Sequence, residues 1–85
     1  MEYNEIVERV IEILEEFTQV NPDSIGENSS LGDDLGIKSI KIIDIIFELE
    51  EEFDIQFSDG AVAMEKFKTV KTIAENVYEK VNTES

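Results

Sequence analysis

The chain has 85 residues, which is enough for one small domain with a single core and too few for a catalytic cleft between two domains. Its 7 Lys and Arg residues against 21 Asp and Glu residues give a formal charge of -14, which repels nucleic acids and anionic membranes and favours a basic partner. Because cysteine and histidine are absent, the sequence offers no disulfide, thiolate nucleophile or imidazole base, and it lacks the usual zinc ligands.

The first predicted element is an amphipathic helix over about residues 4–20. Apolar residues recur there at spacings of three and four, and glutamates occupy most of the remaining positions. Asn21-Pro22 ends this pattern. The next stretch, residues 23–36, is rich in Asp, Ser, Asn and Gly, which predicts a long loop that isolated apolar residues anchor to the core: Ile25, Leu31 and Leu35.

A second helix is expected from Ser39 to about Asp54. Its apolar stripe is wider than one helix face, so the helix either lies centrally or exposes part of that stripe to a partner. A short helical piece is expected over residues 61–67, after a break at Ser58-Asp59-Gly60. The last helix is expected to begin at a Thr69 N-cap and to fray after residue 81.

These elements predict an all-α fold: a small bundle of three main helices plus one short helix, with a long first loop. We expect one domain over residues 1–85. No apolar run approaches the roughly 18–20 residues needed to cross a bilayer, and the N-terminus lacks a signal-peptide pattern. We therefore expect a cytoplasmic monomer that binds neither nucleic acid nor membrane.

Catalytic chemistry has few candidates in this sequence. Asp33 and Asp34 are adjacent, as are Glu15 and Glu16, but a working acid and base must face each other across a pocket. Solvated carboxylates are the simpler interpretation, and no calcium-loop or phosphate-loop pattern is present, so we expect no enzymatic activity. Ser39, at the junction of loop and helix, suits two roles: an N-cap, or a hydroxyl presented for covalent modification near the positive end of the helix dipole.

The run from Leu35 to Phe57 resembles the signature region of acyl carrier proteins and the related peptidyl carrier domains. That family usually shows an acidic loop, Leu-Gly, an Asp-Ser-Leu or Asp-Ser-Ile triplet that opens the second helix, and a Leu-Glu-Glu-Phe-like helix end. Here the triplet is Lys38-Ser39-Ile40, and the helix end is Leu49-Glu50-Glu51-Glu52-Phe53. The likeness extends over nearly the whole chain in helix order and acidity.

The resemblance implies that Ser39 carries a 4'-phosphopantetheine arm, which a phosphopantetheinyl transferase donates from coenzyme A. The thiol of such an arm holds an acyl or aminoacyl group as a thioester. The other implied partners are loading, condensing and modifying enzymes with basic docking patches. The docking face would lie on the second helix, with these candidate residues: Lys38, Ile40, Lys41, Ile43, Asp44, Phe47, Glu48, Glu50, Glu51 and Glu52. For Ile40, Ile43 and Phe47, packing in the core is an equally good interpretation.

Two lysines depart from the family pattern. Lys38 replaces the Asp that typically precedes the modified Ser, and Lys41 stands where an acidic residue is common. We therefore expect a carrier for a specialised fatty-acid, polyketide or nonribosomal-peptide pathway, whose dedicated partner presents a complementary acid. The alternatives are a housekeeping fatty-acid carrier, or an acidic helical module that binds a basic partner without a prosthetic group.

Overall fold

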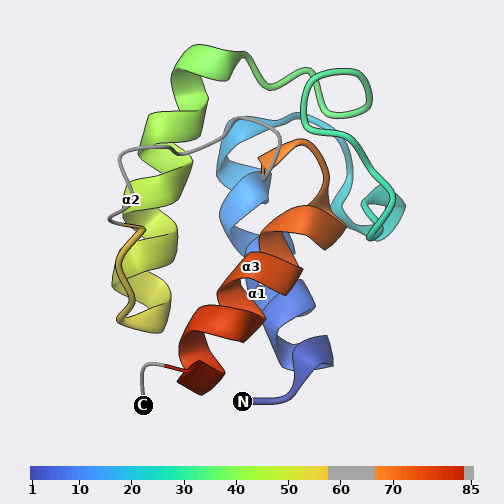
Figure 1. Ribbon diagram of the computed structural model, residues 1–85. Coiled ribbons are helices and arrows are strands. Elements are labelled where there is room, and N and C mark those ends of the chain that lie inside the picture. Colours follow the sequence, from blue (N-terminus) through green and yellow to red (C-terminus); the bar gives the residue numbers. More distant parts are fainter. Residues whose placement is uncertain (58–66, 84–85) are drawn as a thin grey trace.

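The computed structural model describes residues 1–57 and 67–83, which form a small helical bundle (Figure 1). In these residues the helices are α1 (Tyr3–Leu14), η1 (Glu15–Phe17), η2 (Pro22–Ser24), η3 (Ser39–Lys41), α2 (Ile42–Phe53) and α3 (Val70–Thr83), of which the η elements are short 3-10 helices. Within the same ranges, β pairing is confined to one isolated bridge between Ser30 and Thr69. The all-α prediction is confirmed, and the short helix expected over 61–67 falls almost wholly outside the described residues.

The first helix ends earlier than its apolar pattern predicts. The α-helix stops at Leu14 and continues as η1 to Phe17, after which Thr18 is extended with φ -137°. The hydroxyl of Thr18 donates a hydrogen bond to the carbonyl oxygen of Leu35, 2.7 Å away, so the chain leaves the helix here to contact the long loop. The buried face that the pattern predicts for this helix is confirmed, because Ile6, Val10, Ile13 and Leu14 are buried.

The long loop is ordered by its apolar anchors and by pairing with a distant segment. Ile25, Leu31 and Leu35 are all buried, as the sequence predicts. The amide of Leu31 donates to the carbonyl oxygen of Lys68 at 2.8 Å, and the amide of Val70 donates to the carbonyl oxygen of Ser29 at 3.1 Å. The loop is therefore held against the segment that leads into α3.

The predicted N-cap of the last helix is confirmed, and the N-cap role that the sequence left open for Ser39 is excluded. Thr69 Oγ1 accepts from the amide of Thr72 at 3.1 Å, and Thr72 Oγ1 accepts from the amide of Thr69 at 3.1 Å, a reciprocal cap. The second helix instead begins as the 3-10 turn η3, whose N-cap is Lys38, with no side-chain cap. Because Ser39 lies one residue inside this turn, its hydroxyl does not cap the helix.

The core lies between the three α-helices. Figure 1 shows α2 standing beside the crossed pair of α1 and α3. Fully buried side chains come from every α-helix and from the loop: Ile6, Leu14, Leu31, Ile45, Leu49, Ile73, Val10, Val70 and Val77. Tyr3 and Tyr78 pack edge to face at 5.8 Å between ring centroids and join α1 to α3. In the part of the chain that the structure describes, no helix is long and apolar enough to cross a membrane.

Candidate functional site

Ser39 is the first residue of η3. Its side chain is exposed, and its hydroxyl has no hydrogen-bond partner among the described residues. A serine hydroxyl at a loop-to-helix junction usually serves the fold as a cap, and here it does not. The structure thus leaves a free hydroxyl at the surface, beside the backbone amides that open a helix.

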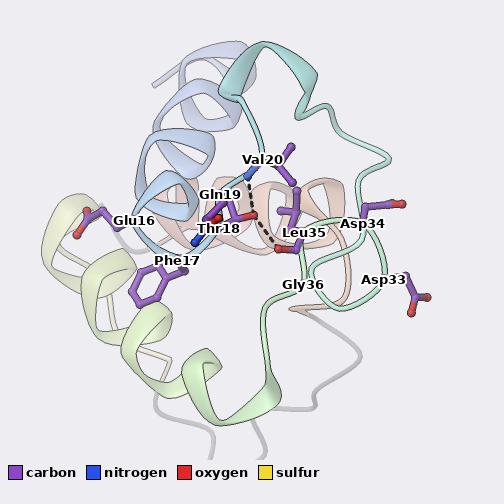
Figure 2. Close-up of a pocket in the computed structure, with 9 residues that line it drawn as sticks. All are labelled: Glu16, Phe17, Thr18, Gln19, Val20, Asp33, Asp34, Leu35 and Gly36. Carbon is purple, nitrogen blue, oxygen red and sulfur yellow. Dashed lines mark hydrogen bonds between the residues drawn. The ribbon is translucent and has the colours of Figure 1, made fainter.

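The loop positions Ser39 by holding the residues just before it. Ile37 is buried, and its amide donates to the carbonyl oxygen of Leu31 at 2.7 Å. Gly36 has φ 66°, a left-handed conformation that glycine adopts without a steric cost. In Figure 2, Thr18 lies against Leu35 at an open pocket of about 750 Å³, and its hydroxyl also accepts from the amide of Val20 at 3.2 Å. The backbone that leads into Ser39 is therefore held by two contacts, one between Ile37 and Leu31 and one between Thr18 and Leu35.

A groove of about 370 Å³ runs beside Ser39. Its lining comes from the loop, from the start of the second helix and from the segment before α3: Ser30, Leu31, Gly32, Asp33, Ile37, Ser39, Ile42, Phe67 and Lys68. Ser39 and Ile42 share this side because side chains three residues apart line up on a 3-10 turn. Local sequence carried no signal for Phe67 and Lys68, because a backbone pairing far along the chain places them here.

Three large apolar side chains next to Ser39 face outward. Ile40 is 73% exposed, Ile43 59% and Phe47 62%, and their spacing of three and four residues puts them on one face. We call these three residues the apolar stripe. The interpretation that they pack in the core is wrong, because the core side of α2 is formed instead by Ile42, Ile45, Ile46, Leu49 and Phe53.

The charged candidates on the second helix differ in their surroundings. Lys38, Lys41, Asp44 and Glu51 are exposed. Glu50 is half-buried, and its Oε2 accepts from the amide of Phe57 at 2.8 Å, so this carboxylate holds the turn after α2. Glu52 forms an ion pair with Arg9 of α1. Glu50 and Glu52 thus have structural roles that the helical pattern alone did not reveal.

Glu48 lies in an acidic groove between α1 and α2. This groove, of about 290 Å³, is lined by Arg9, Glu12, Ile13, Glu16, Glu48, Glu51 and Glu52. Burial raises the pKa of Glu48, and so do its side-chain hydrogen bond with Glu16 and the charges of Glu16, Glu51 and Asp44. Glu16, in η1, was considered from the sequence only as the neighbour of Glu15, because its contact with Glu48 depends on how the first helical segment packs against α2.

The adjacent carboxylates of the loop do not form a catalytic pair. Asp34 accepts from the amide of Ser30 at 2.7 Å, and Ser30 Oγ accepts from the amide of Asp34 at 3.1 Å, so Asp34 stabilises a turn. Figure 2 shows Asp33 and Asp34 pointing away from Thr18 on the outer side of the loop. In the described ranges, no group of three or more acidic, His or Cys side chains is placed to hold a metal ion.

Comparison with known proteins agrees with this geometry. The family model for a phosphopantetheine attachment site matches residues 8–77, most of the chain. The chain belongs to the acyl carrier protein family. The acyl carrier protein of Zymomonas mobilis is 41% identical over 68 residues, which cover 80% of this chain and 85% of that protein. The acyl carrier protein of Chlorobium phaeobacteroides is 37% identical over 76 residues, covering 89% and 95%.

Solved structures of carrier proteins share the fold. The acyl carrier protein from Enterococcus faecalis matches with a TM-score of 0.74 and 26% identity, over 94% of this chain and 99% of that one. A chain from the crystal structure of an engineered Bradyrhizobium japonicum glycine:[carrier protein] ligase complexed with carrier protein from Agrobacterium tumefaciens matches with a TM-score of 0.76 and 25% identity, over 87% and 97%. Acyl carrier proteins carry a covalently attached 4'-phosphopantetheine and are carriers, not enzymes.

Proposed function

We propose that Ser39 is the attachment point of the 4'-phosphopantetheine arm and that residues 1–85 form one carrier domain. The observation that carries this assignment is the exposed hydroxyl of Ser39, which has no partner among the described residues and lies inside the matched range 8–77. The residues around it fit the group: the hydroxyl is open to a transferase, and the amides at the start of η3 favour a nearby phosphate. When bound, the arm supplies a thiol that holds acyl cargo as a thioester.

The apolar stripe supports a docking role for the second helix. Ile40, Ile43 and Phe47 begin one residue after Ser39 and expose a continuous apolar face, which a monomer does not need for its own folding. Lys38 and Lys41 border it at one end, and Asp44, Glu48 and Glu51 lie along the helix. This arrangement suits transient contacts, with apolar burial for affinity and weak exposed charge pairs for orientation.

The partners in this proposal are a phosphopantetheinyl transferase and enzymes that load, condense or modify the cargo. This chain is similar to a chain in the crystal structure of a glycine:[carrier protein] ligase complexed with a carrier protein. That similarity supports enzymes that load the cargo as one class of partner. Lys38 and Lys41 favour a specialised fatty-acid, polyketide or nonribosomal-peptide pathway, because they put positive charge beside Ser39 in a chain of formal charge -14. In this proposal the carrier works as a monomer in the cytoplasm.

Intact mass spectrometry tests the attachment site. The wild-type chain is incubated with coenzyme A and a broad-specificity transferase, and we expect a mass gain equal to one phosphopantetheine group. Ser39→Ala abolishes the gain, whereas Ser24→Ala, a matched change at an exposed serine of η2, retains it. A gain that survives Ser39→Ala would place the arm elsewhere, and no gain with several transferases would favour an interaction module without a prosthetic group.

Charge reversal tests the specialised pathway. If Lys38 and Lys41 exclude generic enzymes, then Lys38→Asp in the loaded carrier raises kcat/KM with a housekeeping fatty-acid condensing enzyme. The matched control is Lys71→Asp on α3, which makes the same charge change away from Ser39. Equal kcat/KM for the wild type and Lys38→Asp would remove the support for a dedicated partner.

A further inference from the structure

Lys68 lines the same groove as Ser39, although the two residues are far apart in the sequence. Both residues line the same groove of about 370 Å³. Lys68 is exposed and forms no ion pair with another described residue. Its neighbour Phe67 is buried in the groove wall, so the segment that carries Lys68 is anchored in the core.

Two backbone hydrogen bonds tie Lys68 to the segment that presents Ser39. The carbonyl oxygen of Lys68 accepts from the amide of Leu31 at 2.8 Å, and the carbonyl oxygen of Leu31 accepts from the amide of Ile37 at 2.7 Å. Ile37 is only two residues before Ser39, and it is buried. The position of Lys68 relative to Ser39 is therefore set by a short, continuous path of bonded backbone, with no free linker between them.

The charge balance of the chain makes this placement unusual. The chain has only 7 Lys and Arg residues, and one of them lines the groove beside Ser39 while two more, Lys38 and Lys41, flank Ser39 along the chain. Elsewhere the chain is dominated by its 21 acidic residues, which would repel a phosphodiester. The acid that lines the same groove is Asp33, which is exposed and competes with Lys68 for any anion there.

We propose that Lys68 binds the phosphodiester of the arm on Ser39 and directs the arm over the groove. This proposal rests on the attachment of the arm to Ser39. A lysine ammonium is a point charge that donates hydrogen bonds to phosphate oxygens, and Lys68 carries one in the lining of the groove that Ser39 shares. Lys38 and Lys41 stay available to a docking partner, while Lys68 serves the carrier's own prosthetic group.

Two-dimensional NMR of the apo and loaded chains tests the proposal without any partner enzyme. The probes are the backbone amides of Leu31, Ile37 and Lys68, together with the ³¹P signal of the arm. In the wild type we expect attachment of the arm to shift these signals, and the shifts to shrink when salt is raised, because an exposed pair is screened. Lys68→Gln makes the shifts at least twofold smaller, Lys68→Arg retains them, and Asp33→Asn enlarges them.

Lys71→Gln is the matched control. Lys71 is an exposed lysine in the first turn of α3 that does not line the groove. The proposal is overturned if Lys68→Gln keeps the full wild-type shifts, or if Lys71→Gln reduces them as much as Lys68→Gln does. If the chain gains no phosphopantetheine mass, the result contradicts the attachment of the arm to Ser39 and not the role of Lys68.

Discussion

Glu48 is a carboxylate whose pKa is raised in the folded chain by burial and by neighbouring acidic groups, and Glu48→Gln removes the charge that they disfavour. The groove between α1 and α2 brings Glu48 to Glu16, while Asp44 and Glu51 lie on the same helix. Arg9, the cation in this groove, is paired with Glu52. An amide at position 48 keeps the shape and the hydrogen bonding of the side chain and removes its charge. We expect the variant to be more stable than the wild type at neutral pH.

The size of the gain follows from three like-charge pairs. Asp44 and Glu51 are four residues before and three residues after Glu48, and such pairs cost about 0.2–0.5 kcal/mol each on exposed helices. The pair with Glu16 adds about 0.2–1 kcal/mol, the range for surface charges in contact. The total is about 1 kcal/mol, which for a domain of this length raises Tm by about 4–8 °C at low salt.

The stability advantage of Glu48→Gln over the wild type is expected to increase with pH. Because the pKa of Glu48 is raised in the folded state, the folded chain holds the proton more tightly than the unfolded chain does. Below the unfolded pKa of about 4.3 both states are protonated and the wild type loses nothing. As pH rises through the folded pKa the wild type becomes less stable, so the advantage of Glu48→Gln opens across this window and is complete above it.

Thermal denaturation followed by circular dichroism, at pH 4.5 to 8 and at low and high salt, measures this effect. Glu79→Gln on α3 is the control, because it removes one charge from the same chain outside the groove. The reasoning is refuted if Glu48→Gln melts no higher than the wild type at pH 7 and low salt. It is also refuted if the gain is as large at pH 4.5 as at pH 7, because a change in packing and not in charge would then be the cause.

Three further predictions concern the core, a helix cap and the docking face. Leu49→Ala, at a fully buried position of α2, costs about 2–5 kcal/mol in urea unfolding, and a loss under 1 kcal/mol would mean that α2 does not pack as described. Thr69→Ala removes the N-cap of α3 and costs about 1 kcal/mol, whereas Thr69→Asp retains most of the stability; equal losses would assign the effect to something other than the cap. Phe47→Ala, at a 62% exposed position, changes the free energy of unfolding by less than about 0.5 kcal/mol but raises the KM of arm transfer to Ser39; an unchanged KM would exclude Phe47 from the transferase contact.

Local patterns predicted the helices and their buried faces because each depends on residues three and four apart. The cap at Thr69 was predictable for the same reason, since its partner is Thr72. The sequence left two roles open for Ser39, and the structure excludes the N-cap, because Lys38 occupies the N-cap position of η3 and no side chain caps it. The general preference of serine for N-cap positions does not predict at which residue a loop enters a helix.

The remaining differences come from contacts between distant segments. The apolar residues of the second helix cover more than one face, so Ile40, Ile43 and Phe47 could either pack in the core or face a partner. Only the side on which α1 and α3 pack decides between these two interpretations. Lys68 enters the groove through its pairing with Leu31, and Glu16 meets Glu48 through the packing of α1 on α2. A single sequence carries no local signal for such pairs, because the periodicity of one helix does not specify its neighbour.

The outward-facing apolar stripe has a consequence for how copies of the chain behave in concentrated solution. Three large apolar side chains, each more than half exposed, would make two copies adhere if nothing kept them apart. The formal charge of -14 supplies that separation at neutral pH, because whole molecules repel each other before their stripes meet. In acid, where the carboxylates take up protons, the same surface becomes self-adhesive, so colloidal stability in this chain depends on charge spread over the whole surface and not on covering the stripe.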